Sequence, residues 1–174
     1  MSDIDQQKGN YYIIADHLRT TIFALADGAT FEPKGRGYIL KKLVKKATLL
    51  SYLLNLNAEQ LIKISEKLIE VNSSYYTHLK EKEKAVINEL EKEINKNMKF
   101  INNSIQELNK NYSPKITAEN IFFWYDTKGI PEELIRFYLE KENYQFPEEE
   151  FNRLLEKQKE KGRKDRERKK VAVF

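Results

Sequence analysis

The segment from Tyr75 to Tyr112 contains neither glycine nor proline. Its apolar residues recur at steps of three and four, at Ile87, Leu90, Ile94, Met98, Ile101, Ile105 and Leu108. Steps that average close to a heptad are typical of a long, gently supercoiled helix that packs against other helices. The segment therefore predicts one long helix, about residues 75–112, within a helical domain.

Helical spacing also recurs on both sides of this segment. Further helices are predicted from Tyr11 to Asp27-Gly28, over residues 58–71 after an Asn57 cap, over residues 118–127 after a Thr117 cap, from Pro131 and from Pro147. No alternating strand pattern of useful length occurs, so the predicted class is all-α, a helical bundle with a basic C-terminal helix or tail. The predicted organisation is a flexible segment at 1–10, a helical domain at 11–160 and a basic tail or linker at 161–174.

Composition excludes several classes of chemistry. The chain has 174 residues, no cysteine and two histidines, which removes disulfides, sulfur-ligated zinc and most histidine-based sites. It also lacks a glycine-rich phosphate loop and a nucleophile with an evident base, so catalysis by this chain is not expected. No apolar run approaches the roughly 20 residues needed to span a bilayer, and no signal sequence is apparent, so a soluble, cytoplasmic protein is predicted.

The stretch FEPKGRGYILKKLVKKA, residues 31–47, concentrates positive charge on one helix. A turn built on Pro33, Gly35 and Gly37 is predicted to lead into this helix. The apolar stripe expected to be buried comprises Ile39, Leu40, Leu43, Val44 and Ala47.

The other side of this helix carries Lys41, Lys42, Lys45 and Lys46, called here the lysine cluster. Residues three or four apart share a helix face, and like charges so placed repel one another. The cluster is therefore either a solvated face, which is the commoner explanation of such runs, or a binding surface for a polyanion, for which RNA is the hypothesis.

Two stretches resemble a known family. The run IIADHLRTTIFALADG followed by GRGYILKKLVKKA resembles the start of the helical tRNA-recognition region of alanyl-tRNA synthetases, and FFWYDTKGIPEELI resembles a later segment of that region with a YDT-x-G-x-P signature. The order and separation of the motifs agree with the family. Together they span the chain from Tyr11 to about Lys161.

The resemblance implies that the chain is a fragment that holds the acceptor stem of alanine tRNA and inspects its G·U wobble pair. The parent enzyme would bind ATP, magnesium and alanine in a catalytic domain, with zinc as an option in its editing domain. No cofactor is expected in this fragment. Its expected partners are the acceptor stem and the catalytic domain of the same protein, and no membrane.

Residue roles follow from the matching motif positions. The aspartate of the YDT motif is Asp126, which in the family reads the wobble pair from the minor groove; a carboxylate suits this task because the guanine exocyclic amine is a donor there. In the family an asparagine also reads the wobble pair, and its position corresponds to Pro33 in this chain. Lys34 or a backbone group would have to take over that role here. The family's phosphate-contacting basic positions correspond to Arg36 and the lysine cluster.

Two alternatives stay open at this point. The chain could instead be a helical scaffold that holds a protein partner through its long helix, with the basic residues serving solubility. The four consecutive aromatic residues at positions 122–125 are expected to pack within the protein rather than to stack on bases.

Overall fold

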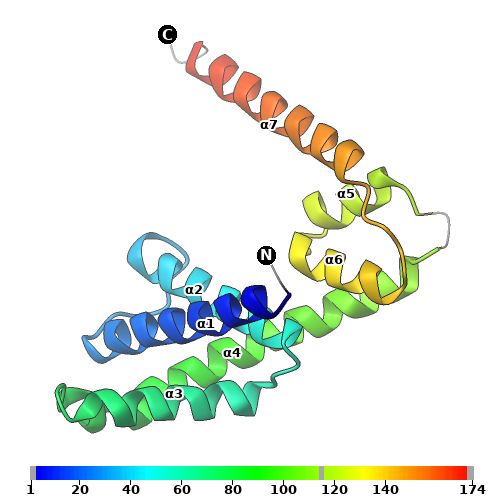
Figure 1. Ribbon diagram of the computed structural model, residues 1–174. Coiled ribbons are helices and arrows are strands. Elements are labelled where there is room, and N and C mark those ends of the chain that lie inside the picture. The colour runs from blue at the N-terminus through cyan, green and yellow to red at the C-terminus, as the bar shows by residue number, and fades with distance from the viewer. Residues whose placement is uncertain (1–2, 114–115, 172–174) are drawn as a thin grey trace. The chain divides into compact units, whose positions relative to one another are not determined.

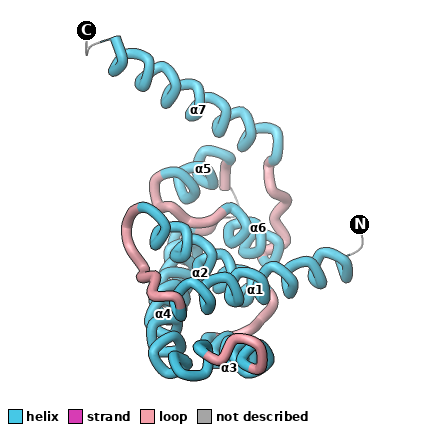
Figure 2. The backbone as a smooth tube through the Cα atoms, turned by 90° about the vertical axis from the view of Figure 1, so that its left-hand side faces the viewer, coloured by secondary structure: helices cyan, strands magenta, loops and turns pink. Residues whose placement is uncertain are grey.

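A computed structural model describes residues 3–113 and 116–171, and these residues fold into helices joined by loops (Figures 1 and 2). The helices are α1 (Asp3–Ala26), α2 (Gly35–Leu53), α3 (Ala58–Ser73), α4 (His78–Asn111), α5 (Ala118–Asp126), α6 (Glu132–Lys141) and α7 (Glu148–Val171). No strand occurs over these two ranges. The predicted all-α class is confirmed, and α4 is the long helix predicted over residues 75–112.

The chain divides into two compact units at a point inside α4. The first unit ends at Asn103 and the second begins at Ser104. The sequence predicted a single domain over residues 11–160 and gave no sign of this boundary, because neither a glycine nor a proline interrupts α4. Each unit has buried apolar side chains of its own.

The first unit has a core to which all of its helices contribute. Ile22 of α1, Val44 of α2, Leu61 of α3 and Leu90 of α4 are buried in one cluster. In Figure 1, α3 and the first part of α4 lie side by side and run in opposite directions. Burial of apolar area at about 25 cal/mol per Å² is the main force that holds such helices together.

Helix α1 starts earlier than predicted. It begins at Asp3, so from that residue on the segment expected to be flexible is helical, and residues 1–2 lie outside the described range. A single glycine costs a helix only about 1 kcal/mol relative to alanine, so Gly9 does not stop α1. The predicted end is confirmed, because Gly28 follows Ala26 with a φ of +95°.

The start of α3 was predicted correctly from the sequence, but its buried positions were not all predicted. The predicted Asn57 cap is confirmed: its side chain accepts a hydrogen bond from the Gln60 backbone at 2.9 Å, and the Gln60 side chain accepts one from the Asn57 backbone at 2.8 Å. The helical spacing of Leu61, Ile64, Leu68 and Val71 predicts that all four face inward, but Val71 is 60% exposed, whereas Ile69 is fully buried. Buried positions of α3 recur every four residues, through Leu61, Ser65 and Ile69, and this turns Val71 towards solvent.

The second unit packs α5, α6 and α7 through aromatic and aliphatic side chains. Phe151 at the start of α7 is 1% exposed, and its ring lies 6.0 Å from that of Phe122 and 5.6 Å from that of Tyr125 (centroid distances). Trp124 is 2% exposed. The expectation that this aromatic run packs within the protein is therefore confirmed, except that Phe123 is 47% exposed.

The predicted basic tail at 161–174 is part of α7 as far as Val171, and residues 172–174 lie outside the described range. The described side chains of α7 beyond Leu155 are exposed. The cap predicted at Thr117 is confirmed as a capping box with Asn120. Pro131 precedes α6 as its N-cap residue rather than lying in its first turn.

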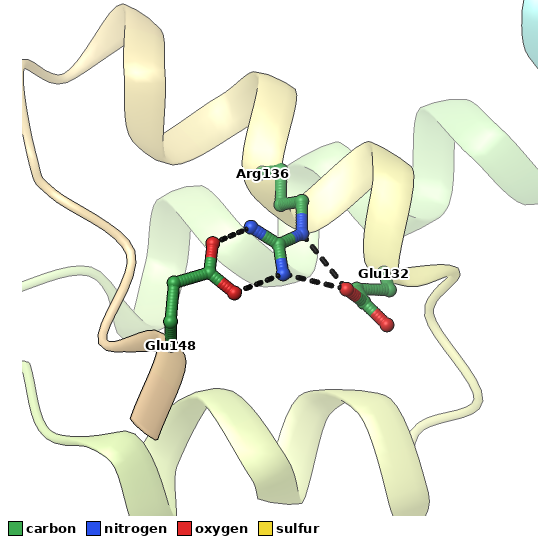
Figure 3. A network of polar contacts seen from close by, with 3 residues as sticks. All are labelled: Glu132, Arg136 and Glu148. Carbon is green, nitrogen blue, oxygen red and sulfur yellow. Dashed lines mark hydrogen bonds and ion pairs between the residues drawn. The ribbon is translucent and has the colours of Figure 1, made fainter. Parts of the chain in front are cut away.

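A network of charges joins α6 to the start of α7 (Figure 3). Arg136 donates from Nη1 and Nη2 to the two carboxylate oxygens of Glu148, and from Nε to Glu132 at 2.8 Å. The Arg136 guanidinium also stacks 3.8 Å from the centroid of the Phe146 ring. A planar guanidinium suits this bidentate and stacked arrangement better than a lysine ammonium would. The network thus fixes how the chain enters α7.

The network predicts a dependence of stability on pH. Hydrogen bonds from Arg136 hold the pKa of the Glu148 carboxyl below its usual range. Because that pKa is lower in the folded protein than in the unfolded chain, the stabilisation is present above the unfolded value of about 4.3 and is lost as the pH falls through the folded value. Between roughly pH 5 and pH 3, the urea midpoint of Glu148→Gln should therefore fall less than that of the parent protein.

Glu149→Gln is the matched control, since Glu149 is an exposed neighbour in the first turn of the same helix. Its urea midpoint should follow the parent's pH profile. Equal acid sensitivity of Glu148→Gln and the parent protein would contradict a role for the Arg136–Glu148 pair in stability.

Candidate nucleic-acid interface

The loop before α2 is fixed by a close backbone approach. The helix begins at Gly35, which has a φ of +64°, so Gly37 lies in the first turn of the helix rather than in the predicted turn before it. A Cβ at Gly37 would lie 2.4 Å from the backbone oxygen of Thr30 and 2.6 Å from the backbone nitrogen of Glu32. Only glycine fits there, and the contact sets where α2 starts relative to the loop.

The buried side of α2 is narrower than predicted. Leu40, Val44 and Ala47 are buried, but Ile39 is 57% exposed, contrary to the prediction, and Leu43 is half-buried. Ile39 precedes the buried Leu40 by one residue, a rotation of about 100° around the helix, which takes it out of the core. Tyr38 is also exposed, at 44%, and it adds a second large apolar side chain to the surface near the lysine cluster.

The lysine cluster lies on the surface of α2. Lys42 and Lys45 are exposed, while Lys41 and Lys46 are half-buried. The ammonium of Lys42 lies 4.6 Å from the centroid of the Tyr38 ring, and that of Lys45 lies 4.9 Å from the centroid of Phe100 on α4. Aromatic faces attract cations and leave their charge unneutralised, so both ammonium groups remain available to an anion.

The absence of acidic residues distinguishes α2 from α3 and α4, where several lysines lie beside glutamates. Lys63, Lys67, Lys80 and Lys92 each lie 2.6 to 2.9 Å from a glutamate oxygen. In contrast, Lys41, Lys42 and Lys45 form no ion pair with any residue that the structure describes, and α2 contains no acidic residue. The surface therefore carries positive charge that the fold itself leaves unbalanced.

The start of α2 adds to this positive charge. Its N-cap residue, Lys34, makes no side-chain capping hydrogen bond, and Lys34 and Arg36 are both exposed. A helix N-terminus carries a partial positive charge, which here has the same sign as the neighbouring side chains. Pro33, where the family's asparagine falls, is exposed beside Lys34.

Asp126 is the last residue of α5, in the second unit, and it is exposed. A carboxylate at a helix C-terminus faces the negative end of the helix dipole, which is unfavourable by about 0.3–1 kcal/mol. Its Oδ1 accepts a hydrogen bond from Gln158 Nε2 on α7, and no cation pairs with it in the described part of the second unit. Lys128, two positions further on, pairs instead with Glu107 at 2.7 Å.

The structure thus gathers Lys34, Arg36 and the lysine cluster around the first turns of α2, whereas Asp126 belongs to the other unit. Sequence reasoning missed Gln158, because its contact with Asp126 spans 32 positions and no motif marks it. Within residues 3–113 and 116–171, no three histidine, aspartate or glutamate residues are grouped so that they could hold a metal ion. No described helix is long and apolar enough to cross a membrane.

Comparison with known proteins agrees with the resemblance noted in the sequence. The model of the family described as tRNA synthetases class II (A) matches residues 2–173. An alanine–tRNA ligase of Campylobacter jejuni subsp. doylei is 31% identical over 153 residues, which is 86% of this chain and 18% of the ligase. Alanine–tRNA ligases of Fervidobacterium nodosum and Clostridioides difficile are each 34% identical, over 157 and 161 residues, again 18% of each ligase.

The chain therefore spans about a fifth of the length of the curated relatives it matches. Their shared name and the length of the family match confirm the resemblance to alanyl-tRNA synthetases. This chain belongs to the class II (A) tRNA synthetase family, and it corresponds to a helical segment of alanine–tRNA ligases.

Proposed function

We propose that this chain is the tRNA-recognition segment of an alanine–tRNA ligase, and that it holds the acceptor stem of alanine tRNA. The observation that carries the proposal is the uncompensated positive charge of Lys41, Lys42 and Lys45 on a helix without acidic residues. ATP-dependent aminoacylation, with its magnesium, is assigned to a catalytic domain of the parent enzyme, and zinc to an editing domain. None of the residues described above is assigned to those groups.

The side of α2 that carries the lysine cluster suits a phosphate backbone. Lysine ammonium groups bind phosphates as point charges, and each phosphate they neutralise releases condensed counterions. The uncapped N-terminus of α2, with Lys34 and Arg36, adds positive charge one to two helical turns before the lysine cluster. Contacts of this kind position RNA without reading its sequence.

Sequence discrimination is assigned to Asp126. In a G·U wobble pair the guanine exocyclic amine is not used in pairing and faces the minor groove, where a carboxylate oxygen can accept from it. Asp126 fits this role because it is exposed, lacks a cationic partner among the described residues, and occupies a helix end where a carboxylate does not help the helix.

Replacing Asp126 with alanine should remove the preference of the 174-residue chain for an acceptor-stem RNA hairpin with a G·U pair over the same hairpin with a G·C pair. The expected loss in the ratio of the two dissociation constants is about tenfold, the contribution of one hydrogen bond to a charged acceptor. Fluorescence anisotropy with both hairpins measures that ratio. Glu140→Ala, which removes an exposed carboxylate on α6, should leave it unchanged.

A ratio that is equal before and after Asp126→Ala would remove Asp126 from the reading role. The rival hypothesis, a protein-interaction scaffold, is separated by a gel-shift titration with the same hairpins across salt concentrations. Binding that is absent, or insensitive to salt, would favour the scaffold, since phosphate-mediated binding must weaken steeply as salt rises.

A further inference from the structure

One side-chain contact links the end of α5 to the middle of α7: Gln158 Nε2 donates a hydrogen bond to Asp126 Oδ1. Both residues are exposed, so neither is held there by burial. This contact is also the only hydrogen bond to the Asp126 side chain within the described part of the chain. Because Gln158 contacts the carboxylate assigned to base reading, Gln158 is a candidate residue for controlling base-pair discrimination by Asp126.

The packing of α5 against α7 explains why the two side chains meet. Phe122 and Tyr125 contact the buried ring of Phe151, and Asp126 follows one position later on α5. Gln158 lies two helical turns after Phe151, and therefore on the same side of α7. The Arg136–Glu148 network fixes the start of α7 in addition. The register of Gln158 against Asp126 is thus set by the packing of two partly buried rings on the buried Phe151 ring and by a bidentate ion pair.

The hydrogen bond uses only part of the carboxylate. An ionised carboxylate has two oxygens and about four acceptor sites, and Gln158 occupies one site on Oδ1. The terminal torsion of an aspartate is soft, so an exposed carboxylate without a partner samples many orientations. A donor on one oxygen restricts that rotation and leaves Oδ2 available in a defined direction.

We propose that Gln158 is a positioning residue that orients Asp126, so that Oδ2 can accept the hydrogen bond from the guanine amine. The inference rests on the proposed function, because it needs Asp126 to read the pair. Gln158 acts through Asp126 and makes no base contact of its own. Gln158 therefore affects the preference between base pairs, while the overall affinity for RNA is assigned to the first unit.

The experiment measures the dissociation constants of the 174-residue chain for the G·U and G·C hairpins in four forms: the parent, Gln158→Ala, Gln158→Glu and Asn152→Ala. Gln158→Ala removes the donor and should reduce the G·U preference about three- to tenfold, with binding to the G·C hairpin unchanged. Gln158→Glu keeps the size of the side chain, but it cannot donate and places a like charge beside Asp126. It should reduce the preference at least as much.

Asn152→Ala is the matched control, because it removes another exposed amide from α7 at a position without a described contact to Asp126. It should leave the preference as in the parent. A double-mutant cycle then tests the route of the effect: in the Asp126→Ala background, Gln158→Ala should change nothing further. Thermal unfolding of each variant checks that the fold is retained.

Three results would overturn the inference while leaving the proposed function intact, and the first two concern Gln158→Ala alone. One is a preference for the G·U hairpin that stays unchanged in Gln158→Ala although Asp126→Ala abolishes it. The other is a rise in G·U affinity in Gln158→Ala, which would make Gln158 a competitor for the carboxylate. A loss that persists in the Asp126→Ala background would also refute action through Asp126. A parent protein with no G·U preference would overturn both the inference and the reading role of Asp126.

Discussion

Replacing Gly37 with alanine is expected to destabilise the first unit by about 3 kcal/mol, at the upper end of overpacking effects. The added Cβ would lie 2.4 Å from the Thr30 carbonyl oxygen and 2.6 Å from the Glu32 nitrogen, and both of these atoms are backbone, which cannot rotate away. For a unit of this size the midpoint of thermal unfolding should fall by about 10–20 °C. Circular dichroism during a temperature scan measures the change.

Gly9→Ala is the control for this prediction, since Gly9 lies within α1 and nothing lies within 4 Å of a Cβ added there. It should leave stability unchanged or raise it by up to about 1 kcal/mol. If Gly37→Ala unfolds at the same temperature as the parent protein, the close approach between the loop and α2 is wrong. The start of α2, and with it the placement of Lys34 and Arg36, would then need revision.

Replacing all of the lysine cluster with alanine is expected to weaken binding to the G·U and the G·C hairpins alike, by about 100-fold at low salt, or roughly 0.7 kcal/mol for each lysine. The slope of log K against log salt should fall by roughly three, because each lost phosphate contact removes about 0.7–0.9. The ratio between the two hairpins should stay constant, since phosphate contacts do not read bases. Anisotropy titrations over a range of salt concentrations give both quantities.

The matched control replaces Lys63, Lys67, Lys80 and Lys92 with alanine, which removes the same formal charge from the same unit. These lysines are already paired with glutamates, so RNA binding should change little. If both quadruple variants lose affinity equally, net charge rather than the lysine cluster governs binding. A change in the hairpin ratio on loss of the cluster would assign base reading to the first unit.

Local signals in the sequence were enough for the class of fold and for most helix boundaries. Asn57 and Thr117 were predicted as caps because a side-chain acceptor before a helix satisfies a free backbone N–H, and both form capping boxes. Gly28 was predicted to end α1 because glycine tolerates the left-handed conformation, and its φ is +95°. Each of these features depends only on residues a few positions apart.

What the sequence could not give depends on contacts between distant segments. Ile39 and Val71 satisfied the apolar spacing, but the neighbouring helices cover adjacent positions instead and leave both of them exposed. Glycine is common in turns, so Gly37 was predicted to lie in one. Only the position of the Thr30 carbonyl shows that a glycine is needed at this position inside the helix. The Asp126–Gln158 contact requires the packing of α5 on α7, which no local pattern encodes.

The absence of acidic residues from α2 also bears on the protein without RNA. Like charges three or four residues apart destabilise a helix by about 0.2–0.5 kcal/mol per pair, and Lys42 forms such pairs with Lys45 and Lys46. Under the proposed function, the side chains assigned to RNA binding therefore weaken the helix that carries them, a trade between stability and affinity. A laboratory selection for heat resistance alone should therefore remove lysines from this helix, and under the proposed function the selected variants should be more stable but bind RNA more weakly.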